Sequence, residues 1–334
     1  MAGLTEVEIK IILMELIKRC LILALVTQSK SRGVYDPAND ENEDDFLAEF
    51  GLPKINNQEI KIQRNTALKE HEKLIKRQNE QYNNGMKSWW DKLNDFADLP
   101  DEQRDKEKTG AKVEIEREYN YRGLILDNIT EDRSEAYFDM FRYSRSSHPS
   151  SYNAVKEAIV SPVQNQQICG SCVSFATIAT VETCFKKITG VFGDYSEQEL
   201  VDCAYGQGAN GCRGAKFWSY AKWIVKNKRE LMSEVDYPYL NTRPNLRCPR
   251  EKPYRLGARV TDYSYTRHGD EETMKKLVYE HGAVVTGVCA DSTFSYYGGG
   301  VLNGCMYSEV NHAVAVVGYG TDENGLPYWL IKNS

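Results

Sequence analysis

The sequence predicts an α+β protein, and four stretches carry this prediction. Residues 58–82 form a highly charged stretch without glycine or proline, in which one set of side chains recurs every three or four positions, as on a helix face. A second helix is predicted to open at Cys172 and to stop at Gly190, because apolar residues in between follow helical spacing. Residues 310–318 and 328–333 are apolar and strand-like. Helices therefore precede strands along the chain.

Length and composition limit the class of protein. The 334 residues suffice for about two domains, or for one large domain with an appendage. Hydrophobic residues make up 41% and charged residues 27%, which is ordinary for a globular protein and excludes disorder as the main state. The net charge of −6 gives no indication of a nucleic-acid partner.

The nine cysteines are distributed unevenly. Only Cys20 precedes residue 169, and the other eight fall between 169 and 305. This division predicts two segments that are stabilised differently, with disulfide bonds in the second segment alone.

The N-terminal residues have the pattern of a secretory signal. Residues 14–29 contain a basic start, a seven-residue apolar core at 20–26 and small residues suited to cleavage after Ser29. The apolar core is too short to span a bilayer. The alternative is an ordinary amphipathic helix, and either Met1 or Met14 could be the start of the chain. We favour the signal, and hence the secretory pathway with a lysosomal or extracellular destination.

Four residues could together carry out nucleophilic catalysis: Gln166, Cys172, His312 and Asn333. A cysteine in the first turn of a helix faces unpaired N–H groups and the positive end of the dipole, which favours the thiolate. A lone histidine in an apolar strand is most often a packed core residue. The catalytic interpretation of His312 therefore depends on its combination with the other three residues. The alternatives for Cys169 and Cys172 are a redox pair or half a zinc site, but the sequence has no second Cys-x-x-Cys.

The order Gln-x5-Cys…His…Asn resembles that of the papain/cathepsin cysteine peptidases. Further matches to that family lie at residues 195–203, 211–214 and 237–239. Val173 departs from the family pattern, which has an aromatic residue after the cysteine. The resemblance implies a papain-like fold of two lobes, a helical lobe that holds Cys172 and a β-barrel-like lobe that holds His312 and Asn333.

The resemblance also implies a role for each residue. Cys172 would be the nucleophile, Gln166 an oxyanion donor, His312 the acid and base, and Asn333 the group that orients the imidazole. No cofactor or metal is implied. Three residues would line the substrate cleft, namely Gly214, Ala215 and Phe217, where the family usually has a second glycine in place of Ala215.

The family pattern implies a set of disulfide bonds as well. Cys169 would pair with Cys212, and Cys203 with Cys248. Cys305 resembles the first member of a third bridge whose partner lies beyond residue 334, and the pairing of Cys184 and Cys289 stays open.

The stretch before the catalytic motif resembles the inhibitory pro-region of cathepsin-L-like zymogens. The matching helix face consists of Arg64, Leu68, His71, Ile75 and Asn79, and residues 94–98 follow it as Asn-x-Phe-x-Asp. We therefore divide the chain into a signal region (1–29), a pro-region (30–147) and a C-terminally incomplete peptidase domain (148–334). Within the pro-region, residues about 58–98 would inhibit, and 99–147 would form a charged connector. Acidification is expected to release the pro-region by neutralising carboxylates such as Asp98.

The sequence thus predicts a cysteine-type endopeptidase made as a zymogen. Its expected partners are protein or peptide substrates and its own pro-region as an intramolecular inhibitor, with no nucleic acid and no membrane span, in a monomer. The alternative from another class is a catalytically impaired papain-fold protein that acts as a binding or inhibitory module. Val173 and Ala215 favour this alternative.

Overall fold

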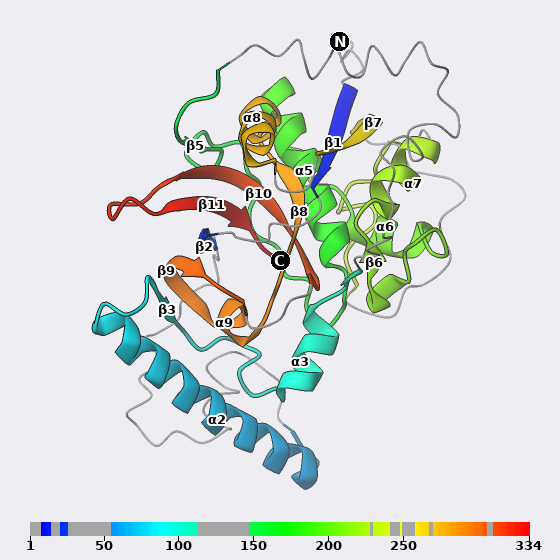
Figure 1. The fold of residues 1–334 in the computed structure, drawn as a ribbon. Helices are drawn as coiled ribbons and strands as arrows, with labels where there is room; N and C mark the ends of the chain where they lie inside the picture. The colour runs from blue at the N-terminus through cyan, green and yellow to red at the C-terminus, as the bar shows by residue number, and fades with distance from the viewer. Residues whose placement is uncertain are drawn as a thin grey trace, which may run out of the picture.

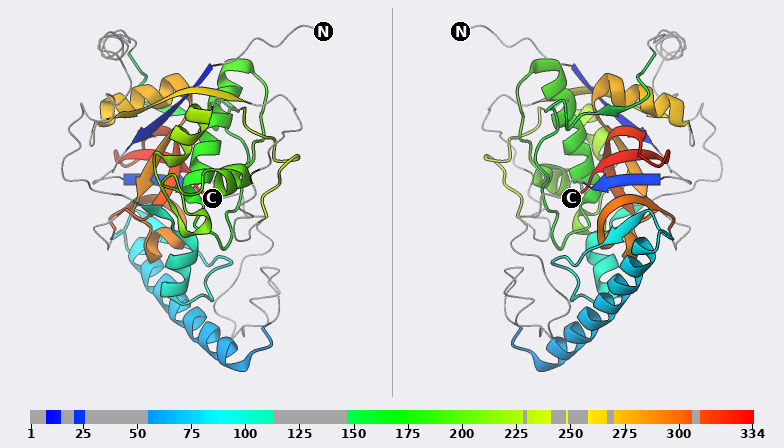
Figure 2. Two further views of the ribbon diagram at one scale, coloured as in Figure 1. Left: turned by 90° about the vertical axis from the view of Figure 1, so that its right-hand side faces the viewer. Right: turned by 90° about the vertical axis from the view of Figure 1, so that its left-hand side faces the viewer.

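The structure is a computed structural model that describes residues 8–14, 21–25, 55–112, 147–227, 230–240, 248, 258–266, 270–305 and 310–334. A group of helices packs beside a large β-sheet, and the long helix α2 (Gln58–Asn83) crosses one end of the molecule (Figures 1 and 2). The predicted α+β class is confirmed. The connector from 113 to 146 lies outside the described residues.

The helical lobe is built around α5 (Cys172–Thr189), which α6 (Glu197–Cys203), α7 (Ser219–Asn227) and the short 3-10 helix Gly211–Arg213 accompany. Helix α5 begins at Cys172 and ends at Gly190, which has a left-handed φ of 75°, as the sequence predicts. Every residue of α5 from Cys172 to Cys184 is buried. The helix can therefore pack on both the lobe's own core and the sheet.

The sheet contains nine strands in the order β3-β9-β2-β11-β10-β8-β1-β7, with β5 paired to β10. The strands are β1 (Glu8–Met14), β2 (Leu21–Leu25), β3 (Trp89–Asp91), β5 (Tyr152–Asn153), β7 (Arg259–Thr266), β8 (Val284–Val288), β9 (Tyr297–Asn303), β10 (His312–Thr321) and β11 (Pro327–Lys332). The helices α8 (Glu271–His281) and α9 (Ser292–Ser295) flank β8 in sequence. Within the described residues the sheet is open, so the barrel-like lobe is not a closed barrel.

Two hydrophobic cores correspond to the two lobes. One gathers buried side chains of α5, α6 and α7, and the other those of β8, β10, β11 and α8. Helix α5 contributes to both, since Ala176 packs in the first core and Ala179 in the second. Strands β10 and β11 form an antiparallel hairpin whose turn uses Gly325 at φ 81°. Burial of α5 thereby fixes the helical lobe against the sheet.

Strands β1 and β2 come from the region predicted to be a signal. Strand β2 pairs with β11 and β9, and β1 pairs with β7 and β8. Neither strand has the helical form of the alternative interpretation. Signal cleavage near Ser29 stays a prediction, and it would separate both strands from the rest of the chain. No helix among the described residues is long and apolar enough to cross a membrane.

The segment 55–112 docks on the sheet lobe. The Asn57 side chain caps α2 by accepting from two backbone N–H groups of its first turn. The predicted helix face is used: Leu68, His71 and Ile75 are buried, and the guanidinium of Arg64 lies 2.9 Å from Asp98. Strand β3 then pairs antiparallel with β9, and helix α3 (Asp101–Lys108) and strand β4 (Ala111–Lys112) follow.

Side chains lock this docked segment in place. The Asn79 amide donates to the backbone carbonyl of Asp91 and accepts from its N–H, at 2.9 and 2.7 Å. The guanidinium of Arg104, 1% exposed, donates to the Tyr296 hydroxyl at 2.9 Å. The ring of His71 bonds to the Ala97 carbonyl at 2.6 Å. The segment is thus held by specific polar contacts in addition to its apolar face.

Disulfide bonds join Cys169 to Cys212 and Cys203 to Cys248. A third bond joins Cys305 to Cys289, with Cα atoms 6.2 Å apart, so the expectation of a partner beyond residue 334 is wrong. The chain returns through α9 and β9 and brings these two cysteines, 16 residues apart, side by side. Cys172 and Cys184 are buried and belong to none of these bonds.

Acidic residues in the docked segment carry raised pKa values. Burial raises the pKa of Asp98, although Arg64 opposes the shift. A carboxyl whose pKa is raised in the docked state favours docking when it is protonated, and this contribution is lost as the pH rises. Burial and the Arg64 pair therefore act in opposite directions on Asp98, and release of the segment on acidification stays a prediction.

We predict that Asp91 makes docking of the segment weaker as the pH rises from about 4 to 7. Burial raises its pKa to about 7, and one carboxylate oxygen has no hydrogen-bond partner. The Asp91→Asn variant should be more stable than the parent protein at pH 8 by about 2 kcal/mol, and about equally stable at pH 4, because partial hydration screens part of the shift. Urea unfolding at the two pH values measures this. Asp98→Asn, which breaks the Arg64 pair, is the control and should gain no such stability; an equal gain would contradict the prediction.

Candidate active site

Cys172 lies at the seam between the lobes, where the start of α5 meets the start of β10. The side chain is 0% exposed. Its sulfur lies close to the backbone N–H groups of Ala313 and Val173, and to those of Gly110 and Ala111 in the docked segment, all of which favour the thiolate. The sulfur therefore touches both walls of the seam and the segment that covers it.

His312 and Asn333 lie on the sheet wall. His312 is the first residue of β10, and Asn333 follows the last residue of β11, so the hairpin brings the two together. The His312 Nε2 atom is 2.6 Å from the Asn333 Oδ1 atom. An amide oxygen can only accept, so Nε2 carries the proton and Nδ1 is the basic nitrogen. Nδ1 is buried and has no hydrogen-bond partner in the described structure.

The start of β10 is fixed by Asn311. Its side chain exchanges two hydrogen bonds with the backbone of Ala290, at 2.8 and 3.0 Å. Phe294 packs edge-on against the His312 ring with centroids 5.6 Å apart. These contacts leave the imidazole little freedom to turn.

Gln166 lies beside the same seam and is 1% exposed. Its Nε2 donates to the carbonyl of Cys169 at 2.9 Å and to the carbonyl of Lys108 at 3.1 Å. The Ser334 hydroxyl donates to its Oε1 at 2.8 Å, and the Tyr239 hydroxyl donates to its backbone carbonyl at 2.8 Å. The amide is thus held in place and faces a carbonyl oxygen.

Sequence reasoning assigned no role to Ser334 or Tyr239. Ser334 follows Asn333 directly, so its position next to a candidate residue was the available signal. Tyr239 belongs to the stretch 237–239, which was matched to the family pattern without a role for the hydroxyl.

Segment 109–112 crosses the seam directly over Cys172. Strand β4 pairs in parallel with β6 (Ala215–Lys216), and Ala215 donates its N–H to the Gly110 carbonyl at 2.8 Å. The N–H groups of Gly110 and Ala111 both reach the Asn311 carbonyl, at 3.1 and 3.0 Å. The segment therefore bridges the two lobes and shields the sulfur from water.

Glycines allow this close approach. A Cβ on Gly110 would lie 2.1 Å from the carbonyl oxygen of Gly170, and a Cβ on Gly214 would lie 2.1 Å from that of Gly110. Gly214, which also has a φ of 91°, and Ala215 thus lie against an extended backbone, where they were predicted to bind substrate. Phe217 is 4% exposed and belongs to the same hydrophobic core as Ala111.

Burial controls the charge state of the site. Desolvation raises the pKa of Cys172 to about 11, although the N–H donors oppose it, and lowers the pKa of His312 to about 4, although Asn333 opposes it. The sequence predicted a thiolate favoured by the helix start, but in this closed form the thiol and the imidazole are both neutral. The helix start cannot compensate for the complete loss of water.

Val173, the departure from the family pattern, is fully buried in the core of the helical lobe. Its side chain belongs to the same hydrophobic core as Cys172 and Ala176. Among the residues that the structure describes, no group of three or more histidine, cysteine, aspartate or glutamate side chains could hold a metal ion.

Comparison with known proteins agrees with this arrangement. The family model described as papain family cysteine protease matches residues 148–334. Fruit bromelain from Ananas comosus is 31% identical over 94% of this chain and 83% of its own length. Cathepsin L from Sarcophaga peregrina is 37% identical over 56% of this chain, and the match spans about half (55%) of that relative.

The architecture is also that of solved precursors. Digestive procathepsin L2 from the larval midgut of Tenebrio molitor superposes with a TM-score of 0.73, at 28% identity, over 87% of this chain and 88% of its own. The match includes residues outside the peptidase domain, since the domain alone is little more than half of the chain. The chain belongs to the papain family of cysteine proteases.

Proposed function

We propose that the chain is the precursor of a thiol endopeptidase in which Cys172, His312 and Asn333 carry out the reaction. The main support for this proposal is the position of Cys172, His312 and Asn333 at the seam between the lobes. The backbone N–H of Ala313, the residue next to His312, lies near the Cys172 sulfur and favours its thiolate, and the His312 imidazole is bonded to Asn333 at 2.6 Å. This arrangement supports the roles of nucleophile, base and orienting group that we propose for Cys172, His312 and Asn333.

The proposed reaction begins when the covering segment leaves and water enters. The Cys172 thiol transfers its proton to Nδ1 of His312, and the sulfur attacks a peptide carbonyl carbon. The Gln166 Nε2–H and the backbone N–H of Cys172 would hold the oxyanion, a donor pair of the kind worth about 3–4 kcal/mol per donor. The imidazolium then protonates the leaving amine. Finally His312 takes a proton from water, which attacks the thioester and releases the acid and the thiol.

Latency follows from the contacts of the covering segment. It desolvates Cys172, and the carbonyl of Lys108 occupies the Nε2–H of Gln166. Parallel pairing of β4 with β6 holds the Gly110 backbone where a peptide substrate would pair with Ala215. The segment therefore acts as an intramolecular inhibitor in this proposal.

The same pairing removes one of the arguments for a catalytically impaired protein. Ala215 has a methyl group where the family usually has glycine, yet its N–H still bonds to an extended backbone at 2.8 Å. The methyl group therefore does not prevent a peptide from pairing there. Proteins or peptides are the proposed substrates, and the disulfide bonds suit an oxidising secretory, lysosomal or extracellular setting.

We predict that a peptidyl epoxide labels Cys172 once the chain is activated. The reason is that Cys172 alone combines a helix start with a histidine partner, whereas Cys184 is buried within α5. Mass spectrometry of tryptic peptides locates the adduct. The control is Cys184→Ala, which should label fully, and Cys172→Ala should not label. An adduct mainly on Cys184 would falsify the proposed nucleophile.

We further predict that activation shifts the pH profile of thiol alkylation. With a pKa of about 11, the closed form holds only about 10⁻⁴ of Cys172 as thiolate at pH 7. Opening should lower the pKa below about 7.5, as for other cysteines at a helix start beside histidine. Rates of iodoacetamide modification against pH, before and after removal of residues 1–147, test this. Superimposable profiles would contradict the role of desolvation.

A third prediction concerns Gly110. The Gly110→Val variant should displace the covering segment, because its Cβ collides with the Gly170 carbonyl. Overpacking costs about 1–3 kcal/mol, so alkylation of the precursor should become about tenfold faster or more. The control is Lys106→Ala, on an exposed position of α3, which should react like the unmodified precursor. Equal rates for the two variants would show that the segment does not depend on this close approach.

A further inference from the structure

A buried lysine directly precedes the candidate orienting residue. Lys332 is the last residue of β11 and is 5% exposed. Its ammonium donates to the Ser161 hydroxyl at 2.8 Å and lies 4.0 Å from the Glu182 carboxylate. A buried charge is costly unless it is paired, so this arrangement requires a compensating role or partner.

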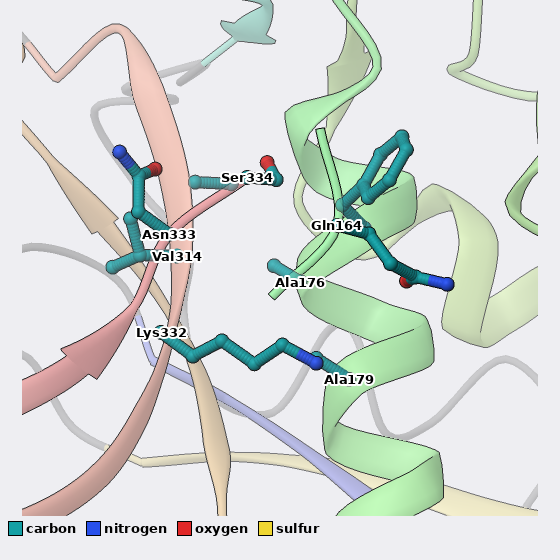
Figure 3. A pocket seen from close by; sticks show the side chains of 9 residues that line it. Gln164, Ala176, Ala179, Val314, Lys332, Asn333 and Ser334 are labelled. Atoms are coloured by element: carbon teal, nitrogen blue, oxygen red, sulfur yellow. The ribbon is translucent and has the colours of Figure 1, made fainter. Parts of the chain in front are cut away.

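The partner lies on the helix that carries the nucleophile. Glu182 is on α5, which starts at Cys172, and its side chain is 1% exposed. Its carboxylate accepts from the hydroxyl of Ser161 and from the backbone N–H of Tyr195, the latter at 3.0 Å. We call Ser161, Glu182 and Lys332 the seam cluster. Figure 3 shows the Lys332 side chain reaching from β11 across to α5, where its nitrogen lies beside Ala179.

More acidic than basic residues surround the seam cluster. A second buried carboxyl group, Glu197 at the start of α6, has its pKa raised well above the ordinary value by burial and by Glu182. One of its oxygens has no hydrogen-bond partner. Burial lowers the pKa of Lys332, while Glu182, Glu197 and Asp194 oppose the shift. Burial also raises the pKa of Glu182 while Lys332 opposes that shift, so each of these two groups favours the charged form of the other.

The backbone pairing of β11 does not extend to Asn333. The last residue of β11 that pairs with β10 is Lys332, opposite Ala315, so the backbone ladder ends before Asn333. A cavity of about 10 Å³ separates this end of the strand from α5, lined in part by Ala176, Ala179 and Val314. Asn333 is thus anchored through its two neighbours in the chain, through the contacts of Lys332 on one side and through the hydrogen bond of Ser334 to Gln166 on the other.

We propose that the seam cluster positions the catalytic amide, with Lys332 as a positioning residue. The contacts of Lys332 fix the end of β11 against α5, and so hold the Asn333 oxygen where it accepts from Nε2 of His312. Loss of these contacts lets Asn333 move away, and the imidazole then loses the contact that keeps its proton on Nε2. This inference rests on the roles proposed for Cys172, His312 and Asn333.

The test compares three variants of the full-length chain. Lys332→Met alone leaves Glu182 buried without its partner and could unfold the protein. The double variant Glu182→Gln/Lys332→Met removes both charges with little change of shape, and so retains the fold. Lys332→Arg keeps the charge and should act as the conservative rescue. Lys187→Met is the matched control, because Lys187 is another partly buried lysine on α5, bonded to the Tyr152 hydroxyl at 2.9 Å.

Two measurements separate positioning from stability. The tautomer of His312 is read by ¹⁵N NMR in the full-length chain, and kcat and KM are measured after activation and active-site titration. In the double variant we expect a mixture of tautomers and a fall in kcat of about 10²-fold with KM changed less than about twofold, because a misplacement of about 1 Å has that effect. Lys332→Arg should recover most of kcat, and Lys187→Met should match the parent.

The outcomes are distinguishable from failure of the proposed function. An unmodified chain whose Cys172 neither labels nor hydrolyses peptides would refute the proposed function. A folded double variant that keeps the Nε2–H tautomer of the parent would overturn the positioning role, whether or not hydrolysis is detected. Parental kcat in the double variant would overturn it equally.

Discussion

The packing of the start of α5 against the start of β10 is the constraint on which the site depends. Cys172 is the first residue of α5 and His312 is the first residue of β10. The distance between them therefore depends on how the helix packs against the strand. Helix α5 is buried over most of its length and supplies side chains to both hydrophobic cores. Any movement of the helix relative to the sheet therefore changes the separation of the proposed nucleophile and base. The backbone N–H of Ala313 lies near the Cys172 sulfur at this contact.

The covering segment lies in the same seam that a substrate would occupy. The segment and a substrate therefore exclude each other. The N–H groups of Gly110 and Ala111 reach the sheet wall at Asn311, and the Gly110 carbonyl reaches the helical wall at Ala215. A backbone that satisfies both walls removes water from between them. The loss of water then explains why both titrating groups are neutral in the closed form, without any change in their positions. The helix start is present throughout, but its effect on the thiol depends on access of solvent.

The sequence predicted the elements better than the contacts between them. The helix from Cys172 to Gly190 and the paired C-terminal strands could be predicted because hydrophobic periodicity and a glycine stop are local properties. The same holds for the buried face of α2. The Ser334 contact to Gln166 joins residues 168 positions apart, and no local pattern indicates it. The pairing of Cys289 with Cys305 was not predictable either, because cysteine spacing does not determine connectivity.

The pKa shifts of buried groups also depend on contacts that the sequence does not show. Asp98 lies beside Arg64 only in the folded chain, where burial raises its pKa and the guanidinium opposes the shift. The seam cluster shows the same competition at the other end of the site. Two buried carboxyl groups, Glu182 and Glu197, lie near the one lysine, and burial raises the pKa of both while Lys332 opposes the shift. Because Lys332 is adjacent to Asn333, an interaction that neutralises the interior of the protein also fixes the end of the strand that carries the proposed orienting amide.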